Sequence, residues 1–438
     1  NMAAPSSEDD KYAAVPGQLP DGAPDGHEAD EEAIAKAQRL VEEAETGGRD
    51  ITGWLGWLVF VLAIAWSLFQ LGIASVVVMD AFKSRIFHLL FAMVLTFIVF
   101  PGRRKDGAKT VPWYDWLMFL LSAGTLIYLL ADFVGIQQRF GLALDHEIVL
   151  GTVFMVVLLE ATRRSLGPAL AVIAAIFLLY AMVGPRGLIP LPLPDIISHR
   201  GYGLKRVIEQ MYISTEGVFG TALGVSTQLV FLFVLFGAML DRAGAGKYFI
   251  DLANSFLGVY RGGPAKVAVV ASGLTGMVSG SSLANVVTTG TFTIPLMRRA
   301  GYPAHKAAAV EVAVSTNGQL MPPVMGAAAF IMAEFTNLPY IEVVKAAVIP
   351  AILSYLALFY IVHLEALKLG MKGVPRKELP PRWKTFIGGI HFLIPLAVLI
   401  YYLVIARSSP AFAVMWAIAS LIVLMLVQAP IKAIRQRE

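Results

Sequence analysis

The sequence predicts an all-α polytopic membrane protein. Of its 438 residues, 57% are hydrophobic and only 15% are charged, and the mean hydropathy is +0.68. Soluble proteins are about a quarter charged. From Trp54 onward, apolar runs long enough to cross the roughly 30 Å hydrocarbon layer recur with short polar breaks. We therefore expect about ten transmembrane helices in the lipid bilayer, together with one re-entrant helical hairpin.

Charge is unevenly distributed along the chain. Residues 1–50 hold 13 acidic and 4 basic residues, which leaves 18 acidic and 31 basic residues for the rest. Because most of those bases flank apolar runs, they indicate cytoplasmic loops and not a nucleic-acid surface. The chain has no cysteine, which excludes disulfides, zinc–thiolate sites and cysteine nucleophiles.

The first 51 residues are expected to form an acidic cytoplasmic tail. Residues 1–30 are rich in Pro, Gly, Asp and Glu and can bury little apolar surface. Residues 31–46 place apolar side chains on one face at helical spacing, and a Gly-Gly pair follows. This pattern predicts a short helix at the membrane surface.

Ten apolar runs predict the transmembrane helices, and they are 54–79, 86–101, 113–131, 147–164, 167–184, 221–240, 305–333, 341–367, 386–405 and 410–428. Basic residues cluster after the second, fourth and eighth runs. The positive-inside rule then makes the N-terminus cytoplasmic and the Pro-rich stretch 184–203 periplasmic. The amphipathic segments 204–219 and 246–260 suit helices in the plane of the interface.

The stretch 264–300 predicts the re-entrant hairpin. It is apolar at both ends and polar in the middle, and basic residues flank both ends, so the ends lie on one side of the membrane. Its middle, TGMVSGSSLAN (275–285), is rich in small and hydroxyl residues. Non-helical backbone at membrane depth lines a cavity or is buried in protein, and its freed carbonyls and hydroxyls suit alkali cations. The alternative is an ordinary span that packs through Gly276 and Gly280.

A second polar constellation, STNGQLMPP (315–323), interrupts the run 305–333. Two prolines cannot donate hydrogen bonds, so the helix is expected to break near Gly318. A broken helix beside a polar hairpin tip is typical of a secondary-transporter ion site. A simple proline kink is the alternative.

Two acidic residues fall inside predicted spans. Glu160 lies one turn before the arginines at 163–164, which favours a structural ion pair over a proton relay. Glu311 lies near the start of its span and is expected either at the interface or paired with Arg298 or Lys306. The sequence has neither a complete P-loop nor clustered histidines, so we expect no enzyme activity, and energy for transport would come from an ion gradient or from partners.

The sequence resembles the fused membrane component of tripartite ATP-independent periplasmic (TRAP) transporters of the TAXI type. Three segments carry the resemblance: 279–330, 45–54 (ETGGRDITGW) and 158–170 (LLEATRRSLGPAL). The resemblance implies an elevator-type, ion-transporter-like fold. It implies a four-helix small scaffold domain (52–164), a linking helix with a periplasmic loop (165–203) and the first repeat of a large transport domain (204–385). Residues 386–438 would begin a second repeat.

The resemblance also implies a site and partners. It assigns a Na⁺ site (or H⁺ as the coupling ion) to hairpin side chains and to carbonyls at the helix break: Ser281, Ser282, Asn285, Gly318, Met321 and Pro323. It assigns substrate contacts to neighbouring positions: Ser279, Gly280, Thr316 and Asn317. A periplasmic TAXI-type binding protein would deliver a small carboxylate substrate to this chain in a bacterial inner membrane.

The family pattern continues into a second hairpin and a second broken helix. We therefore expect a chain truncated after the first repeat, whose partner would be the missing second half of the large domain. The alternatives are a non-transporting scaffold or assembly fragment, or half of a split transporter. An ion channel fits less well, because no selectivity-filter repeat or ring of charged residues is visible.

Overall fold

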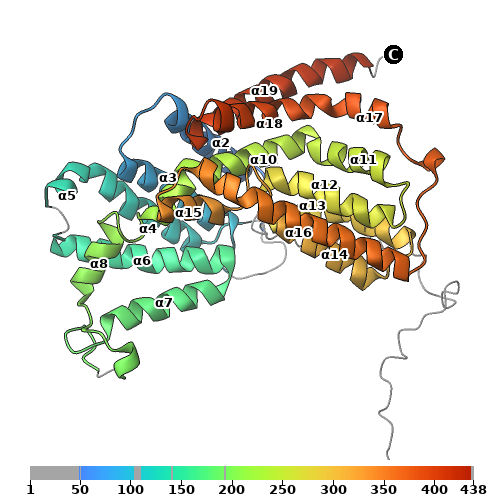
Figure 1. Cartoon of the computed structure of the whole chain (residues 1–438). Helices are drawn as coiled ribbons and strands as arrows, with labels where there is room; N and C mark the ends of the chain where they lie inside the picture. The colour runs from blue at the N-terminus through green and yellow to red at the C-terminus, as the bar shows by residue number, and fades with distance from the viewer. Residues whose placement is uncertain (1–48, 50, 103–109, 140–141, 192–193, 436–438) are drawn as a thin grey trace, which may run out of the picture.

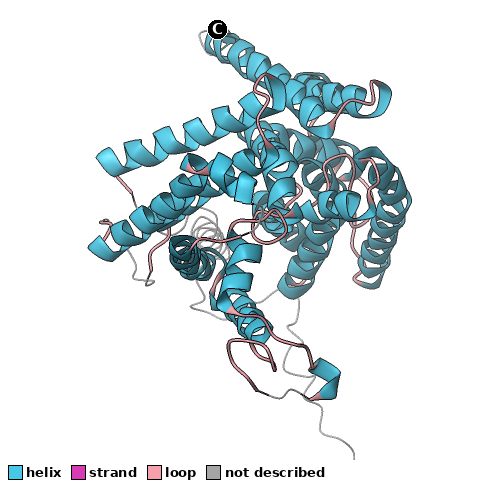
Figure 2. Ribbon diagram, turned by 90° about the vertical axis from the view of Figure 1, so that its left-hand side faces the viewer, coloured by secondary structure: helices cyan, strands magenta, loops and turns pink. Residues whose placement is uncertain are grey.

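The computed structural model describes residues 49, 51–102, 110–139, 142–191 and 194–435. All regular elements in these ranges are helices (Figure 2). The all-α prediction is confirmed for this part of the chain. The predicted surface helix 31–46 and the basic loop 103–109 lie outside the described residues.

The α-helices, in chain order, are α2 (Trp54–Ser75), α3 (Ala81–Val99), α4 (Trp113–Ala131), α5 (Phe133–Arg139), α6 (Asp145–Leu166), α7 (Pro168–Met182), α8 (Leu204–Tyr212), α9 (Thr221–Val225), α10 (Phe231–Ala243), α11 (Ala245–Leu257), α12 (Gly263–Ser279), α13 (Ser282–Arg299), α14 (Ala304–Gly318), α15 (Ala327–Thr336), α16 (Tyr340–Lys368), α17 (Arg382–Gly389), α18 (Leu393–Ile400) and α19 (Pro410–Arg435). Short π-helical turns, η3 (Ser226–Val230) and η6 (Tyr401–Ile405), join α9 to α10 and follow α18.

Seven helical segments in the described residues are long and apolar enough to cross a membrane: Trp54–Ser75, Ala81–Val99, Trp113–Ala131, Thr221–Ala243, Tyr340–Lys368, Arg376–Ile405 and Pro410–Gln428. The predicted run 305–333 is divided between two shorter helices, α14 and α15. Helix α7 has only 15 residues, and α6 has acidic residues in its first turn and basic residues in its last. The membrane-spanning character is therefore supported, and the count of ten spans stays a prediction.

The helices form two neighbouring groups (Figure 1). Helices α3–α8 gather at one side, α10–α14 and α16 lie at the other, and α17–α19 run along one edge. One apolar core joins α3, α4 and α6 with α8, another joins α10 and α11 with α15, α18 and α19, and a third joins α12, α13, α14 and α16. The domain boundaries given above stay predictions.

The surface of several helices is apolar. In α2 the one buried side chain is Gln70, whereas Trp54, Trp57 and Leu68 are each more than 60% exposed. Exposed apolar surface on this scale is typical of contact with lipid. Helix α2 therefore presents most of its circumference as a membrane-facing surface.

A buried ion cluster joins the N-terminal helices. Asp115 in the first turn of α4 is fully buried and accepts a hydrogen bond from Arg49 at 2.6 Å and another from Arg164 of α6 at 2.6 Å. Arg49 also donates to the carbonyl of Ile98 near the end of α3 at 2.7 Å. Arg164 also forms an ion pair with Glu160 of the same helix, with 2.8 Å between Arg164 Nε and Glu160 Oε1. The predicted structural ion pair of Glu160 is confirmed.

Candidate functional site

A tight helical hairpin forms the first half of the candidate site. Helix α12 ends at Ser279, and Gly280 adopts a left-handed conformation with φ of 61°. Ser281 then caps α13, because its hydroxyl accepts from the amide of Ala284 at 3.3 Å. Glycine is the residue that adopts positive φ without steric strain, so Gly280 lets the chain reverse within two residues.

The broken helix forms the second half. Helix α14 ends at Gly318, irregular backbone follows with a cis peptide bond between Pro322 and Pro323, and α15 begins only at Ala327. The hydroxyl of Tyr340 lies 2.6 Å from the carbonyl oxygen of Val324 and so ties this loop to the start of α16. The predicted break near Gly318 is confirmed.

The hairpin packs directly on this break. A Cβ atom on Gly276 of α12 would come within 2.6 Å of the Gly318 Cα, and one on Gly280 would come within 2.3 Å of the Met325 carbonyl oxygen. The amide of Gln319 donates to the Ser282 hydroxyl at 2.9 Å. The two constellations identified from the sequence therefore meet, and their backbones touch because glycines lie at the crossing.

The predicted cation ligands are only partly free. Asn285 is fully buried; its amide nitrogen donates to the Ser272 carbonyl at 3.0 Å, while its Oδ1 has no hydrogen-bond partner among the described residues. The Pro323 carbonyl already accepts from Tyr340 at 2.9 Å, and the Gly318 carbonyl accepts from the amide of Met321 at 3.1 Å. The assignment of these atoms to a cation stays a prediction.

The predicted substrate residues that carry polar side chains, Ser279, Thr316 and Asn317, each hydrogen-bond to a different partner. The Ser279 hydroxyl lies 3.4 Å from the Ser281 carbonyl at the hairpin turn. The Thr316 hydroxyl is bonded to its own helix at 2.7 Å, and the Asn317 amide donates to Ser354 of α16 at 2.5 Å. In this conformation the Asn317 side chain is held by α16, and the substrate assignment also stays a prediction.

A buried polar network, not expected from the sequence, lies beside the crossing. Glu311 of α14 is fully buried, and its carboxylate contacts the hydroxyls of Thr289, Thr293 and Ser315. Ser315 is 3.1 Å from Ser272 of α12. The network therefore connects α12, α13 and α14 through hydroxyl groups.

The expected environment of Glu311 was wrong on two points. Glu311 is not at the interface, because its exposed fraction is 0%. Lys306 is not its partner, because the Lys306 ammonium pairs with Glu365 of α16. A repeat in the sequence could have revealed the network: on α13 the polar positions 285, 289 and 293 recur every fourth residue, which places them on one helix face.

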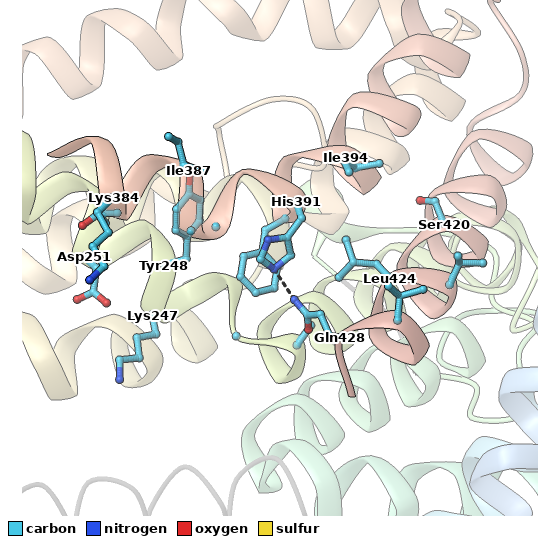
Figure 3. A pocket seen from close by; sticks show the side chains of 18 residues that line it. Lys247, Tyr248, Asp251, Lys384, Ile387, His391, Ile394, Ser420, Leu424 and Gln428 are labelled. Atoms are coloured by element: carbon cyan, nitrogen blue, oxygen red, sulfur yellow. Dashed lines mark hydrogen bonds between the residues drawn. The ribbon is translucent and has the colours of Figure 1, made fainter. Parts of the chain in front are cut away.

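A separate cavity of about 1130 Å³ opens between α10, α11 and α17–α19 (Figure 3). Lys247, Asp251 and Lys384 lie at one end of it, and His391 bonds to Gln428 in the middle. Burial raises the pKa of the Asp251 carboxyl, and the nearby Lys247 partly offsets this effect. None of the predicted site residues lines this cavity.

Comparison with known proteins decides the family. Residues 153–437 match the family model described as "Tripartite ATP-independent periplasmic transporter, DctM component". The chain belongs to this family. The match covers well over half of the sequence and includes both the hairpin and the broken helix of the DctM-family chain.

Several curated relatives share segments with this DctM-family chain. The C4-dicarboxylate TRAP transporter large permease protein DctM of Pseudomonas aeruginosa is 33% identical over 147 residues, which are 34% of each chain. The 2,3-diketo-L-gulonate TRAP transporter large permease protein YiaN of Escherichia coli is 25% identical over 162 residues, 37% of each chain. The sialic acid TRAP transporter permease protein SiaT of Haemophilus influenzae is 31% identical over 144 residues, 33% of this chain and 23% of the relative. The matched part thus spans between 23% and 37% of the length of these relatives.

Proposed function

We propose that the chain is a membrane permease component of a secondary active TRAP transporter that imports a small organic acid. The observation that carries this proposal is the contact between a glycine-lined hairpin turn and a broken helix, at Gly276 and Gly318. Paired helix breaks of this kind are used by secondary transporters to bind ions and substrates. The permease relatives for C4-dicarboxylates, diketogulonate and sialic acid support an anionic organic substrate.

The finer features follow from the same proposal. Helices α12 and α13 would enter the membrane as a re-entrant hairpin from the cytoplasmic side, and α2–α6 would form the scaffold of an elevator mechanism. The transporter would be of the TAXI type with fused small and large components. A periplasmic binding protein would deliver the substrate at the bacterial inner membrane, and the N-terminus would be cytoplasmic.

A cation gradient would drive uptake. Ser281, Ser282 and the free Oδ1 of Asn285 supply oxygens near the break, and such hard ligands suit Na⁺. Losing two ligand oxygens of about 1 kcal/mol each should weaken the apparent affinity for the cation roughly tenfold or more. The test is Ser281→Ala combined with Ser282→Ala, with Ser420→Ala as control, because the Ser420 hydroxyl donates to the Ala417 carbonyl of its own helix at 2.8 Å.

Cation binding can be followed as stabilisation of the purified protein by added Na⁺, with choline for comparison. The double variant should need about ten times more Na⁺, and the control should match the wild type. Uptake of small carboxylates into proteoliposomes, with the binding protein and an imposed gradient, tests transport itself. Uptake without any gradient would refute secondary transport, and absence of uptake under every gradient would favour the alternatives, a scaffold or assembly fragment or half of a split transporter.

A further inference from the structure

Glu311 is an acidic side chain in the centre of the helices that form the candidate site. It lies in the middle of α14, its exposed fraction is 0%, and it forms no ion pair with a described residue. A buried carboxylate without a cationic partner costs several kcal/mol. An ionisable side chain buried among membrane helices therefore marks a candidate functional site.

The charged and titratable groups of the surrounding helices are engaged elsewhere or lie at helix ends. On α14 itself, Lys306 pairs with Glu365 of α16. On α12, Lys266 is 3.1 Å from His363 of α16. Helix α13 has its two basic residues, 298 and 299, in its last turn. The Tyr355 hydroxyl of α16 donates to the Val314 carbonyl at 3.2 Å. The groups that touch the carboxylate are therefore neutral hydroxyls.

The hydroxyls around Glu311 can serve either protonation state. The Thr293 hydroxyl lies 2.5 Å from Glu311 Oε2 and 3.0 Å from the Thr289 carbonyl. The Thr289 hydroxyl lies against Glu311 Oε1 and 2.7 Å from the Asn285 carbonyl. Each hydroxyl has one hydrogen, which it can donate to only one of these acceptors at a time.

Two hydrogen-bond arrangements follow from this geometry. When Glu311 is charged, both threonines donate to the carboxylate. When Glu311 is protonated, both threonines donate to their own helix, and the carboxylic acid donates to one of the hydroxyl oxygens. The change requires only rotation of hydroxyl hydrogens, so the heavy atoms of α12, α13 and α14 stay in place.

The space around the carboxylate favours a proton over a metal cation. A Cβ atom on Gly290 of α13 would come within 3.1 Å of Glu311 Cγ, so α13 lies directly on the side chain. A proton needs no cavity. The hydroxyls of Ser315 and Ser272, 3.1 Å apart, continue from Glu311 to the Asn285 amide, which lies 2.8 Å from Ser272 Oγ beside the hairpin crossing.

We propose that Glu311 is a proton-binding site of the transport unit, so that a proton is a coupling ion of the transporter. The proton comes from water at one side of the membrane, adds to a carboxylate oxygen of Glu311, and returns to water at the other side. This inference rests on the proposed function, because it names the ion that the permease carries. It locates that ion on α14, on a side chain distinct from the predicted Na⁺ ligands.

Infrared difference spectroscopy of the purified chain tests proton binding without any need for transport. A pH jump should produce the carbonyl band of a protonated carboxylic acid, and that band should shift in D₂O. The band should disappear in Glu311→Gln and persist in Glu342→Gln, a control whose half-exposed carboxylate pairs with Lys345 at 2.7 Å. Identical spectra for Glu311→Gln and the wild type would overturn the proposal.

A second set of variants covers the case in which Glu311→Gln does not fold. Thr289→Val with Thr293→Val keeps the shape of both side chains and removes two hydroxyls that bond to the carboxylate. The carbonyl band should then move to the frequency of a more weakly hydrogen-bonded acid. An unmoved band would show that the titrating group is not Glu311.

Transport provides an independent readout. In proteoliposomes with an inward proton gradient, Glu311→Gln should lower uptake at least tenfold, while Glu342→Gln should leave it unchanged. If the wild type shows no uptake, transport by this chain alone fails and the infrared result still decides the proton site. If the wild type transports and Glu311→Gln transports equally well, the proton site fails and the proposed function stands.

Discussion

Replacement of Asp115 by Asn should strongly destabilise the N-terminal helices. The Asp115 carboxylate is fully buried and lies between two guanidinium groups, those of Arg49 and Arg164, whose side chains are 1% and 3% exposed. The Asn side chain has nearly the same shape but no charge. The substitution therefore leaves two buried cations without their shared counter-ion.

The size of the effect follows from the two 2.6 Å hydrogen bonds that Asp115 accepts. Hydrogen bonds to charged groups contribute about 1.5–3 kcal/mol each, and breaking a buried ion pair by removing one partner costs about 3–5 kcal/mol. The Asn carbonyl oxygen can still accept one weaker bond. We therefore expect the free energy of unfolding to fall by about 3 kcal/mol or slightly more.

Unfolding of the purified protein by a denaturing detergent, followed by circular dichroism, measures this loss. The matched control is Asp132→Asn just after the same helix, because Asp132 and its partner Arg139 are 38% and 27% exposed. A pair of that kind contributes under about 1 kcal/mol. An equal loss for Asp115→Asn and Asp132→Asn would refute the reasoning that burial makes the Arg49–Asp115–Arg164 cluster important.

Two further predictions concern the hairpin and the topology. Gly276→Ala should destabilise the protein by about 1–3 kcal/mol, because the new methyl group would meet the Gly318 backbone. The control is Gly124→Ala, whose new methyl group meets nothing within 4 Å. Equal thermal stability of the two variants would contradict the close packing of α12 on α14. A cysteine introduced at exposed Ser198 should react with a membrane-impermeant thiol reagent added outside, and one at exposed Lys372 should not. The reverse labelling pattern would invert the proposed orientation.

The helix break and the ion pair of Glu160 were predictable because both depend on neighbours in the sequence. Two consecutive prolines interrupt the helix after Gly318 whatever the tertiary packing around it. Glu160 and Arg164 are one turn apart, and side chains at this spacing meet on any helix.

The Arg49–Asp115–Arg164 cluster and the Glu311 environment depend on tertiary packing. Arg49 and Asp115 are 66 positions apart, and no local pattern specifies that they meet. Lys306 and Glu311 are five positions apart, so they do not share a helix face, and the lysine pairs with Glu365, 59 positions away. Sequence spacing indicates which residues can share a helix face, whereas the partner on another helix is set by how the helices pack.

The glycine crossing and the buried carboxylate belong to one arrangement. Gly276 and Gly318 let α12 and α14 approach until their backbones touch, and that approach brings Ser272 and Ser315 within 3.1 Å of each other. The same approach leaves Glu311 facing α13, where Thr289 and Thr293 lie one turn apart on the helix face that Asn285 begins. A larger residue at either glycine would separate the helices, open the serine contact and admit water to the carboxylate. The glycines are therefore required both for close helix packing and for keeping Glu311 buried among the hydroxyl groups of Thr289, Thr293 and Ser315.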